Sequence, residues 1–177
     1  MTALRQDELI ERATRIQLVV MDVDGTLTDG AMYYSPQGEA MKRFTTRDGM
    51  GIALAHRAGI RTAIITSEVS DIVVERAKKL KITEVLLGSH DKTTALHDMT
   101  ARLSVPLHAV AYIGDDVNDL HVMQRCGLSA CPNDAVEAIR TVAMMRCAAN
   151  GGHGAVREFI EFILTSQGLP ITLPEQW

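Results

Sequence analysis

Short, wholly apolar runs alternate along this chain with longer segments in which apolar residues recur at helical spacing. The runs precede residues 22, 66 and 114, and a polar segment that favours a turn follows each of them. Uninterrupted apolar runs of this length are typical of central strands in a parallel sheet that helices cover on both sides. The alternation therefore predicts an α/β fold with a doubly wound parallel sheet.

The periodicity also predicts the individual elements. Strands are expected at Leu18–Asp22, Thr62–Thr66, Val85–Leu87, Ala109–Gly114 and Leu128–Ala130. Helices are expected at Arg5–Arg15, Gly49–Arg57, Val69–Leu80, His90–Leu103 and Asn118–Gln124. Between the first strand and the second helix, two extended runs in Met32–Phe44 flank a Pro-Gln-Gly turn and predict a β-hairpin.

Length and composition limit what this sheet can belong to. A chain of 177 residues with 46% hydrophobic content can bury one sizeable core, so we expect one domain over 1–177. A net charge of −4 without a basic stripe makes nucleic acid an unexpected partner. No signal peptide or membrane-spanning stretch is apparent, so a cytoplasmic location without membrane contact is expected. Cys126, Cys131 and Cys147 lack C-x-x-C spacing and are interpreted as small core residues.

The first strand ends in Asp22-Val23-Asp24-Gly25-Thr26. Catalytic groups in parallel sheets lie beyond the carboxyl ends of the strands, and Gly25 would let the backbone close around a ligand there. Two solvated aspartates in an ordinary turn are the alternative interpretation. The appended Gly-Thr favours a site.

Three further strand ends carry candidate chemistry. Thr66 and Ser67 would open a helix and hold a phosphate through hydroxyl and N–H groups, although a helix cap alone would explain Ser67. Lys92 would neutralise phosphate charge, or be an ordinary solvated lysine. Asp115 belongs to a stretch with three aspartates in five residues. These carboxylates repel one another unless a cation or lysine offsets them, although an acidic helix cap is also possible.

Asp-Val-Asp-Gly-Thr, the hydroxyl, the lysine and Gly-Asp-Asp, in this order, resemble the four motifs of the haloacid-dehalogenase superfamily of phosphotransferases. The resemblance covers nearly the whole chain and implies that superfamily's Rossmann-like fold. It also implies Asp22 as nucleophile, Asp24 as acid and base, and Mg²⁺ held by Asp22, the backbone carbonyl of Asp24, and Asp115. Thr66, Ser67 and Lys92 would bind the phosphate.

The residue types suit this chemistry. A carboxylate can attack phosphorus and form an acyl-phosphate that water later cleaves. A second carboxylate can protonate the leaving alkoxide and then deprotonate the water. Mg²⁺ prefers oxygen ligands and lets carboxylate and phosphate approach each other despite their like charges.

The spacing between the motifs leaves no room for a cap domain. An open site needs its missing wall from another subunit or from a large substrate, and the hairpin at about 30–46 is the candidate. Gly38-Glu39, Lys42-x-Phe44 and Gly151-Gly152-x-Gly154 resemble the capless sugar-acid phosphatases of the superfamily. That resemblance implies a homotetramer joined through hairpins and a phosphorylated 2-keto-3-deoxy sugar acid as substrate, an octulosonate 8-phosphate or a nononate 9-phosphate.

One departure bears on the substrate. After the second-motif hydroxyl, the octulosonate branch usually carries Gly-Arg, whereas this chain has Ser67-Glu68. Glu68 together with Lys79 looks like the nine-carbon branch, although neighbouring lysines make a solvated helix face the plainer interpretation of Lys79. Arg76 fits both branches and could pair with the substrate carboxylate.

Two other functions use similar residues. A phosphorelay receiver combines an acidic cluster, a hydroxyl and a lysine on a doubly wound sheet, but it needs neither D-x-D-G-T nor the hairpin. A non-catalytic assembly or regulatory domain of the same fold is the second alternative. Intact Asp22, Asp24, Lys92 and Asp115 favour the enzyme.

Overall fold

A six-stranded sheet in the order β5-β4-β1-β6-β7-β8 forms the centre of the protein in a computed structural model that describes residues 6–174. Each neighbouring pair of strands in this sheet is parallel. The strands are β1 (Leu18–Met21), β4 (Arg61–Ile65), β5 (Glu84–Leu86), β6 (Val110–Ile113), β7 (Leu128–Cys131) and β8 (Met145–Arg146). The chain runs outward from β1 to β5 and then crosses back to β6 on the other side of β1, which makes the sheet doubly wound as predicted.

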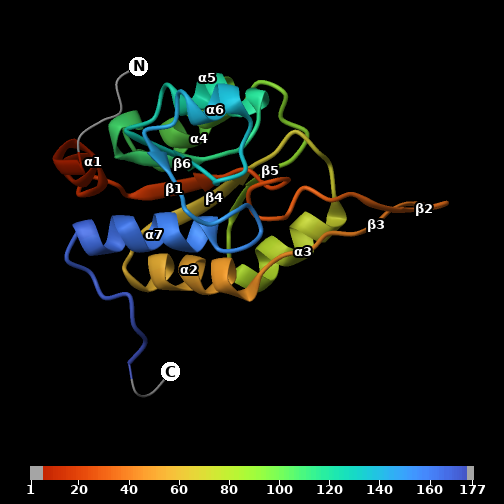
Figure 1. Cartoon of the computed structure of the whole chain (residues 1–177), viewed down its shortest axis with the longest axis horizontal. Helices are drawn as coiled ribbons and strands as arrows, with labels where there is room; N and C mark the ends of the chain where they lie inside the picture. The colour runs from red at the N-terminus through yellow and green to blue at the C-terminus, as the bar shows by residue number, and fades with distance from the viewer. Residues whose placement is uncertain (1–5, 175–177) are drawn as a thin grey trace.

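Helices cover both faces of this sheet (Figure 1). One layer contains α2 (Thr46–Arg57), α3 (Asp71–Leu80) and α7 (Ala155–Ser166), and the other contains α4 (Lys92–Leu103), α5 (Leu120–Met123) and α6 (Glu137–Arg140). The remaining helices are α1 (Gln6–Ala13) and the 3₁₀ turns η1 (Leu107–Ala109) and η2 (Val117–Asp119). Alternate β1 residues serve different layers, because Val19 and Met21 join one core cluster and Leu18 and Val20 join the other.

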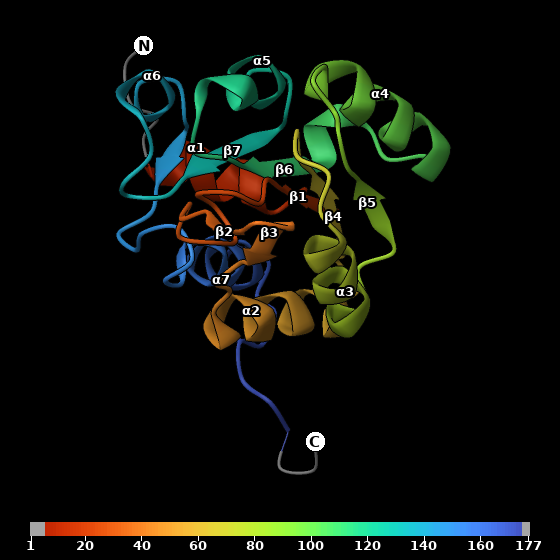
Figure 2. The same ribbon diagram turned by 90° about the vertical axis from the view of Figure 1, so that its right-hand side faces the viewer.

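The predicted hairpin is present between β1 and α2. Strands β2 (Tyr33–Ser35) and β3 (Gly38–Met41) pair antiparallel and project from the body of the molecule (Figures 1 and 2). The exposed large apolar side chains on this projection are Met32, Tyr33, Tyr34 and Met41. No other insertion separates β1 from α2, so the fold carries a hairpin in place of a cap domain, as expected.

Several predicted boundaries need correction. Helix α2 starts at Thr46, three residues before the predicted start, because Thr45 accepts a hydrogen bond from the Arg47 amide and caps it. Helix α3 starts at Asp71 and not at Val69. The predicted first helix includes Arg5, which lies outside the described residues.

The elements after residue 131 were not predicted at all. Strand β8 has only two residues, too few to show a period. Helix α7, however, buries Phe159, Ile160, Ile163 and Leu164 at helical spacing, so the sequence did carry a signal for it. The three cysteines are free and buried, as predicted for core residues. Among residues 6–174, no helix combines the length and apolar character that crossing a membrane requires.

Candidate active site

The candidate site lies beyond the carboxyl ends of β4, β1 and β6. Met21 is in register with Ile64 on one side and Ile113 on the other. Asp22 therefore follows the strand at which the order of strand addition reverses, from β4 on one side to β6 on the other. The Asp22 amide donates to the Ile113 carbonyl at 3.0 Å and fixes that exit. An open pocket of about 260 Å³ is lined there by Asp22, Asp24, Thr66, Ser67, Glu68, Asp115, Asp116, Val117 and Asn118.

The loop after β1 comes very close to the carboxylate that follows β6. Gly25 has a φ of +83°, and a Cβ atom built on it would lie 2.0 Å from Asp115 Oδ2. Thr26 Oγ1 donates to Asp115 Oδ1 at 3.0 Å. Glycine at position 25 is therefore required both by the backbone conformation and by the approach of Asp115.

A buried lysine joins two of the carboxylates. Lys92 begins α4, and its Nζ lies 2.8 Å from Asp22 Oδ1 and 2.6 Å from Asp119 Oδ1. Asp119 also accepts hydrogen bonds from the Tyr112 hydroxyl at 2.6 Å and from the Asp115 amide at 3.1 Å. Lys92 thus supplies the positive charge that the crowded aspartates need, and Asp119 fixes both Lys92 and the backbone at Asp115.

The carboxylates strongly perturb one another. Burial, together with the charge of Asp119, raises the pKa of Asp22 to about 7. Burial and the charges of Asp22 and Asp119 raise the pKa of Asp115 to about 8. Burial alone would lower the pKa of Lys92, but the charges of Asp22 and Asp119 outweigh it and raise this pKa above its ordinary value. A cluster with this excess of negative charge favours binding of a cation.

Three carboxylates could hold that cation. One oxygen each from Asp22, Asp115 and Asp119 lie within 4.8 Å of one another. The family resemblance implies Asp22, Asp115 and the Asp24 carbonyl as ligands and predicts no role for Asp119. Its position four residues after Asp115, within the acidic run, was the available signal. Because both Asp119 oxygens already accept hydrogen bonds from the protein, its evident task is to hold its neighbours in place.

The second carboxylate of the D-x-D motif meets a different lysine. Asp24 Oδ1 lies 2.6 Å from Lys42 Nζ, and the same Nζ lies 2.7 Å from Glu39 Oε1. Lys42 follows β3 of the hairpin, and its side chain is buried. The Lys42-x-Phe44 motif marks Lys42 by family resemblance but predicts no role for it, because its contact with Asp24 exists only once the hairpin folds back over the first loop.

The hydroxyl pair follows β4, but it does not open a helix. The Thr66 side chain accepts from the Glu68 amide at 3.4 Å, and the Gly88 amide donates to the Glu68 carbonyl at 3.2 Å. These bonds hold residues 66–70 as a loop, which corrects the predicted helix start. Ser67 Oγ donates to the Ser89 carbonyl at 3.1 Å. Both hydroxyl groups nevertheless line the pocket, and Glu68 lies exposed at its side.

Arg76 and Lys79 on α3 lie outside the residues that line the pocket. Arg76 Nη2 donates to the Thr45 carbonyl at 3.1 Å, and its guanidinium group stacks 5.5 Å from the centroid of the Phe44 ring. Lys79 is exposed. In one protomer, therefore, Arg76 fastens α3 to the start of α2, and the substrate contacts expected of both residues remain predictions.

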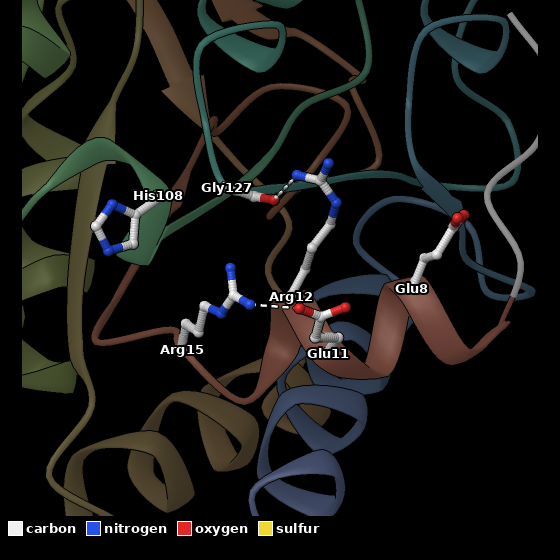
Figure 3. A pocket seen from close by; sticks show the side chains of 6 residues that line it. All are labelled: Glu8, Glu11, Arg12, Arg15, His108 and Gly127. Atoms are coloured by element: carbon white, nitrogen blue, oxygen red, sulfur yellow. Dashed lines mark hydrogen bonds and ion pairs between the residues drawn. The ribbon is translucent and has the colours of Figure 1, made fainter.

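A second pocket lies at the opposite, amino edge of the strands. It is lined by α1 residues with His108 before β6 and Gly127 before β7 (Figure 3). Arg12 reaches the Gly127 carbonyl at 2.8 Å, and Arg15 pairs with Glu11. None of the predicted site residues lies there.

Comparisons with known proteins show the family to which this chain belongs. A family model described as haloacid dehalogenase-like hydrolase matches residues 60–160. The 3-deoxy-D-manno-octulosonate 8-phosphate phosphatase of Yersinia pestis is 41% identical over 161 residues, which cover 91% of this chain and 86% of that protein. Its crystal structure superposes with a TM-score of 0.90 and covers 92% of this chain and 88% of that one.

Two further solved structures carry ligands. The Moraxella catarrhalis phosphatase of the same name, in complex with magnesium ion, phosphate ion and KDO, is 39% identical with a TM-score of 0.90. The match covers 93% of this chain and 94% of that one. The cobalt-bound Haemophilus influenzae phosphatase is 38% identical with a TM-score of 0.87, covering 89% and 92% of the two chains.

Proposed function

The chain belongs to the haloacid dehalogenase-like hydrolases and is a phosphoric monoester hydrolase, and we propose that it dephosphorylates 3-deoxy-D-manno-octulosonate 8-phosphate or a close analogue. The observation that carries this proposal is the contact between Asp22 and Lys92 on the floor of an open pocket. A buried carboxylate held by a lysine and flanked by two hydroxyl groups suits nucleophilic attack on a phosphate monoester.

Asp22 is the nucleophile in this proposal. One of its carboxylate oxygens forms a bond to phosphorus while the bond between phosphorus and the sugar oxygen breaks, giving an aspartyl-phosphate. Lys92 offsets the negative charge of the phosphoryl group and orients Asp22. Thr66 and Ser67, which line the pocket, contact the phosphate oxygens.

Asp24 moves the protons. In its protonated form it donates to the departing sugar alkoxide, and as a carboxylate it then takes a proton from the water that attacks the aspartyl-phosphate. The water oxygen bonds to phosphorus, the bond to Asp22 breaks, and inorganic phosphate leaves. Two carboxylates two residues apart thus serve the two successive steps.

Mg²⁺ fits the acidic cluster. Asp22 and Asp115, with the backbone carbonyl of Asp24, would hold it, and Asp119 would keep Asp115 and Lys92 in position. Hard carboxylate and carbonyl oxygens are the ligands that Mg²⁺ prefers. Burial, and after it the charges of neighbouring aspartates, raise the pKa values of Asp22 and Asp115, and a bound cation would offset both effects. When bound, the ion would neutralise charge on the phosphate during the transfer.

The single protomer encloses little of a sugar acid. Its pocket of about 260 Å³ falls below the roughly 300–1,000 Å³ of usual small-molecule sites, and no cap covers it. We infer that the active form is a homotetramer in which the apolar hairpin of residues 30–46 packs against neighbours and completes their sites. We propose further that residues 1–177 form a single domain and that the protein acts in the cytoplasm. Neither nucleic acid nor a membrane is a partner in this proposal.

A nine-carbon substrate is the second candidate. Glu68 lines the pocket where the octulosonate branch usually carries arginine, so a longer sugar acid with additional hydroxyl or acylamino donors would suit it. The relatives named above, in contrast, act on the eight-carbon ester by their names. Lys79 and Arg76 would contact substrate only in the assembled form.

The decisive experiment traps the intermediate. Wild-type protein with Mg²⁺ and 3-deoxy-D-manno-octulosonate 8-phosphate, quenched in acid, should carry one phosphoryl group on the peptide containing Asp22. Asp22→Asn should carry none and lose turnover, and Asp24→Asn should lose several orders of magnitude in rate. Chelation should abolish turnover, and added Mg²⁺ should restore it. A receiver domain or a non-catalytic module would release no phosphate under any of these conditions.

A further inference from the structure

Lys42 stands out among the buried charges because it belongs to the hairpin. Its side chain is 0% exposed, and its Nζ contacts Asp24 Oδ1 at 2.6 Å and Glu39 Oε1 at 2.7 Å. A buried ammonium group is costly unless it is paired and hydrogen-bonded. The pairing with Asp24 and Glu39 therefore fixes the position of Nζ between the two carboxylates.

Asp24 uses its two oxygens unequally. Oδ1 accepts from Lys42 Nζ at 2.6 Å and from the Thr28 hydroxyl at 3.5 Å, whereas Oδ2 is buried and has no hydrogen-bond partner among residues 6–174. Because Oδ2 is enclosed and receives no donor, the contacts that fix the Asp24 carboxylate act on Oδ1, and the shorter of them is the ion pair with Lys42. Rotation of the Asp24 side chain would break its ion pair with Lys42.

We propose that Lys42 is a positioning residue, whose ion pair with Oδ1 holds the Asp24 carboxylate beside the pocket in the orientation that exchanges a proton with the leaving sugar oxygen and with water. This inference rests on the proposed function, in which Asp24 is the acid and base. Lys42 itself touches neither the phosphate nor the sugar in this scheme. Its effect passes through Asp24.

The anchor continues beyond Lys42. Glu39 on β3 accepts a hydrogen bond from the Ser70 hydroxyl, and Ser70 is the residue before α3. The contacts Asp24–Lys42–Glu39–Ser70 thus join the loop after β1, the base of the hairpin and the loop after β4. A hairpin displaced from its position would move Lys42 and release Asp24.

The leaving group separates this role from a merely structural one. A sugar alkoxide needs a proton as it departs, whereas p-nitrophenolate is stable enough to leave without one. The ratio kcat/KM covers the step in which the leaving group departs. Loss of a positioned acid must therefore lower kcat/KM for the sugar ester far more than for p-nitrophenyl phosphate, while a disturbed fold lowers both alike.

Lys42→Met is the direct test, since methionine keeps most of the volume without the charge. Because general acid–base catalysis contributes roughly 10²–10⁴-fold, we expect a loss of at least about tenfold in kcat/KM for 3-deoxy-D-manno-octulosonate 8-phosphate. The loss for p-nitrophenyl phosphate should stay within about threefold, since that ester does not need the acid. Lys78 is an exposed lysine on α3, and Lys78→Met is the matched control. It should leave kcat/KM unchanged for both the sugar ester and p-nitrophenyl phosphate.

A second variant covers the case in which the first one folds poorly. Lys42→Arg keeps a positive charge at this position, and it should retain more activity on the sugar ester than Lys42→Met does. Equal losses on the two esters in both variants would overturn the role of Lys42 in an otherwise active phosphatase. A wild type that hydrolyses neither ester would instead overturn the proposed function.

Discussion

Gly151 packs so tightly against Gly25 that a Cβ atom on Gly151 would lie 1.8 Å from the Gly25 carbonyl oxygen. The neighbouring Gly152 amide donates to the Thr26 carbonyl at 3.0 Å, so the glycine-rich segment before α7 supports the loop after β1 from behind. The position of the loop after β1 therefore depends on residues more than a hundred positions away in the sequence.

Gly151→Ala should displace that loop. A contact with backbone leaves no side chain free to move aside, so we expect a loss of about 1–3 kcal/mol in unfolding free energy, as overpacked cores show. The rate with p-nitrophenyl phosphate should fall as well, because the loop follows directly on Asp22 and its Thr26 hydroxyl donates to Asp115. Thermal unfolding and steady-state kinetics measure the two effects.

Gly168→Ala provides the comparison for that variant. Gly168 has a φ of +68° and nothing within 4 Å of an added Cβ, so alanine there brings backbone strain without a clash. Stability should fall by about 1–2 kcal/mol, the cost of a left-handed residue, with activity unchanged. Unchanged activity in Gly151→Ala would show that the loop after β1 stands without this support.

The apolar hairpin should hold the protein together as a tetramer. Tyr34 is 66% exposed and Met41 61% exposed in one protomer, a liability unless another surface covers them. Light scattering should give four copies for the wild type and a smaller species for the double variant Tyr34→Lys, Met41→Lys. Val74→Lys, at an exposed apolar position on α3, is the control and should remain tetrameric. A fully active wild-type monomer would contradict both the assembly and the shared site.

Glu68→Arg should change the substrate preference without touching the chemistry. If the carboxylate accepts hydrogen bonds from sugar hydroxyl or acylamino groups, arginine leaves them unpaired, and buried unpaired groups alter discrimination by a few kcal/mol. The ratio of kcat/KM between nine- and eight-carbon esters should fall, while p-nitrophenyl phosphate hydrolysis changes little. Glu75→Arg on the exposed side of α3 is the control. A wild type that prefers the eight-carbon ester, with a ratio that Glu68→Arg leaves unmoved, would exclude the nine-carbon substrate.

His56 should contribute to the loss of stability in acid. Its ring hydrogen-bonds the Thr62 hydroxyl at 2.6 Å, and burial, aided by the charge of Lys81, lowers its pKa below the ordinary value of 6.5. The unfolded chain binds a proton at His56 more readily than the folded protein does. The contribution of His56 to the free energy of unfolding is therefore fully present above the ordinary pKa of 6.5 and is lost as the pH falls toward the lowered pKa. The Tm of His56→Gln should fall less than that of the wild type between neutral and mildly acid pH, as calorimetry can measure. Equal slopes would show that other groups dominate the acid response.

Local patterns predicted the residues that follow strands. Asp22, Thr66 and Asp115 end apolar runs that only a buried strand explains, and parallel strands bring their carboxyl ends to one edge. The sequence predicts that Lys92 lies near a helix start. Its simultaneous contact with Asp22 and Asp119 could not be predicted, because it depends on how α4 packs on the sheet. The motif Lys42-x-Phe44 marks Lys42 but not its contact with Asp24, because the hairpin's direction relative to the first loop is a tertiary property.

The central place of β1 in the strand order also governs when the site can exist during synthesis. Asp22 and Thr66 belong to the part of the chain made first, whereas Asp115 and Asp119 follow β6, which pairs with β1 on its other side. Until β6 has been made and paired with β1, neither Asp115 nor Asp119 can join Asp22, so the acidic cluster cannot form before that step.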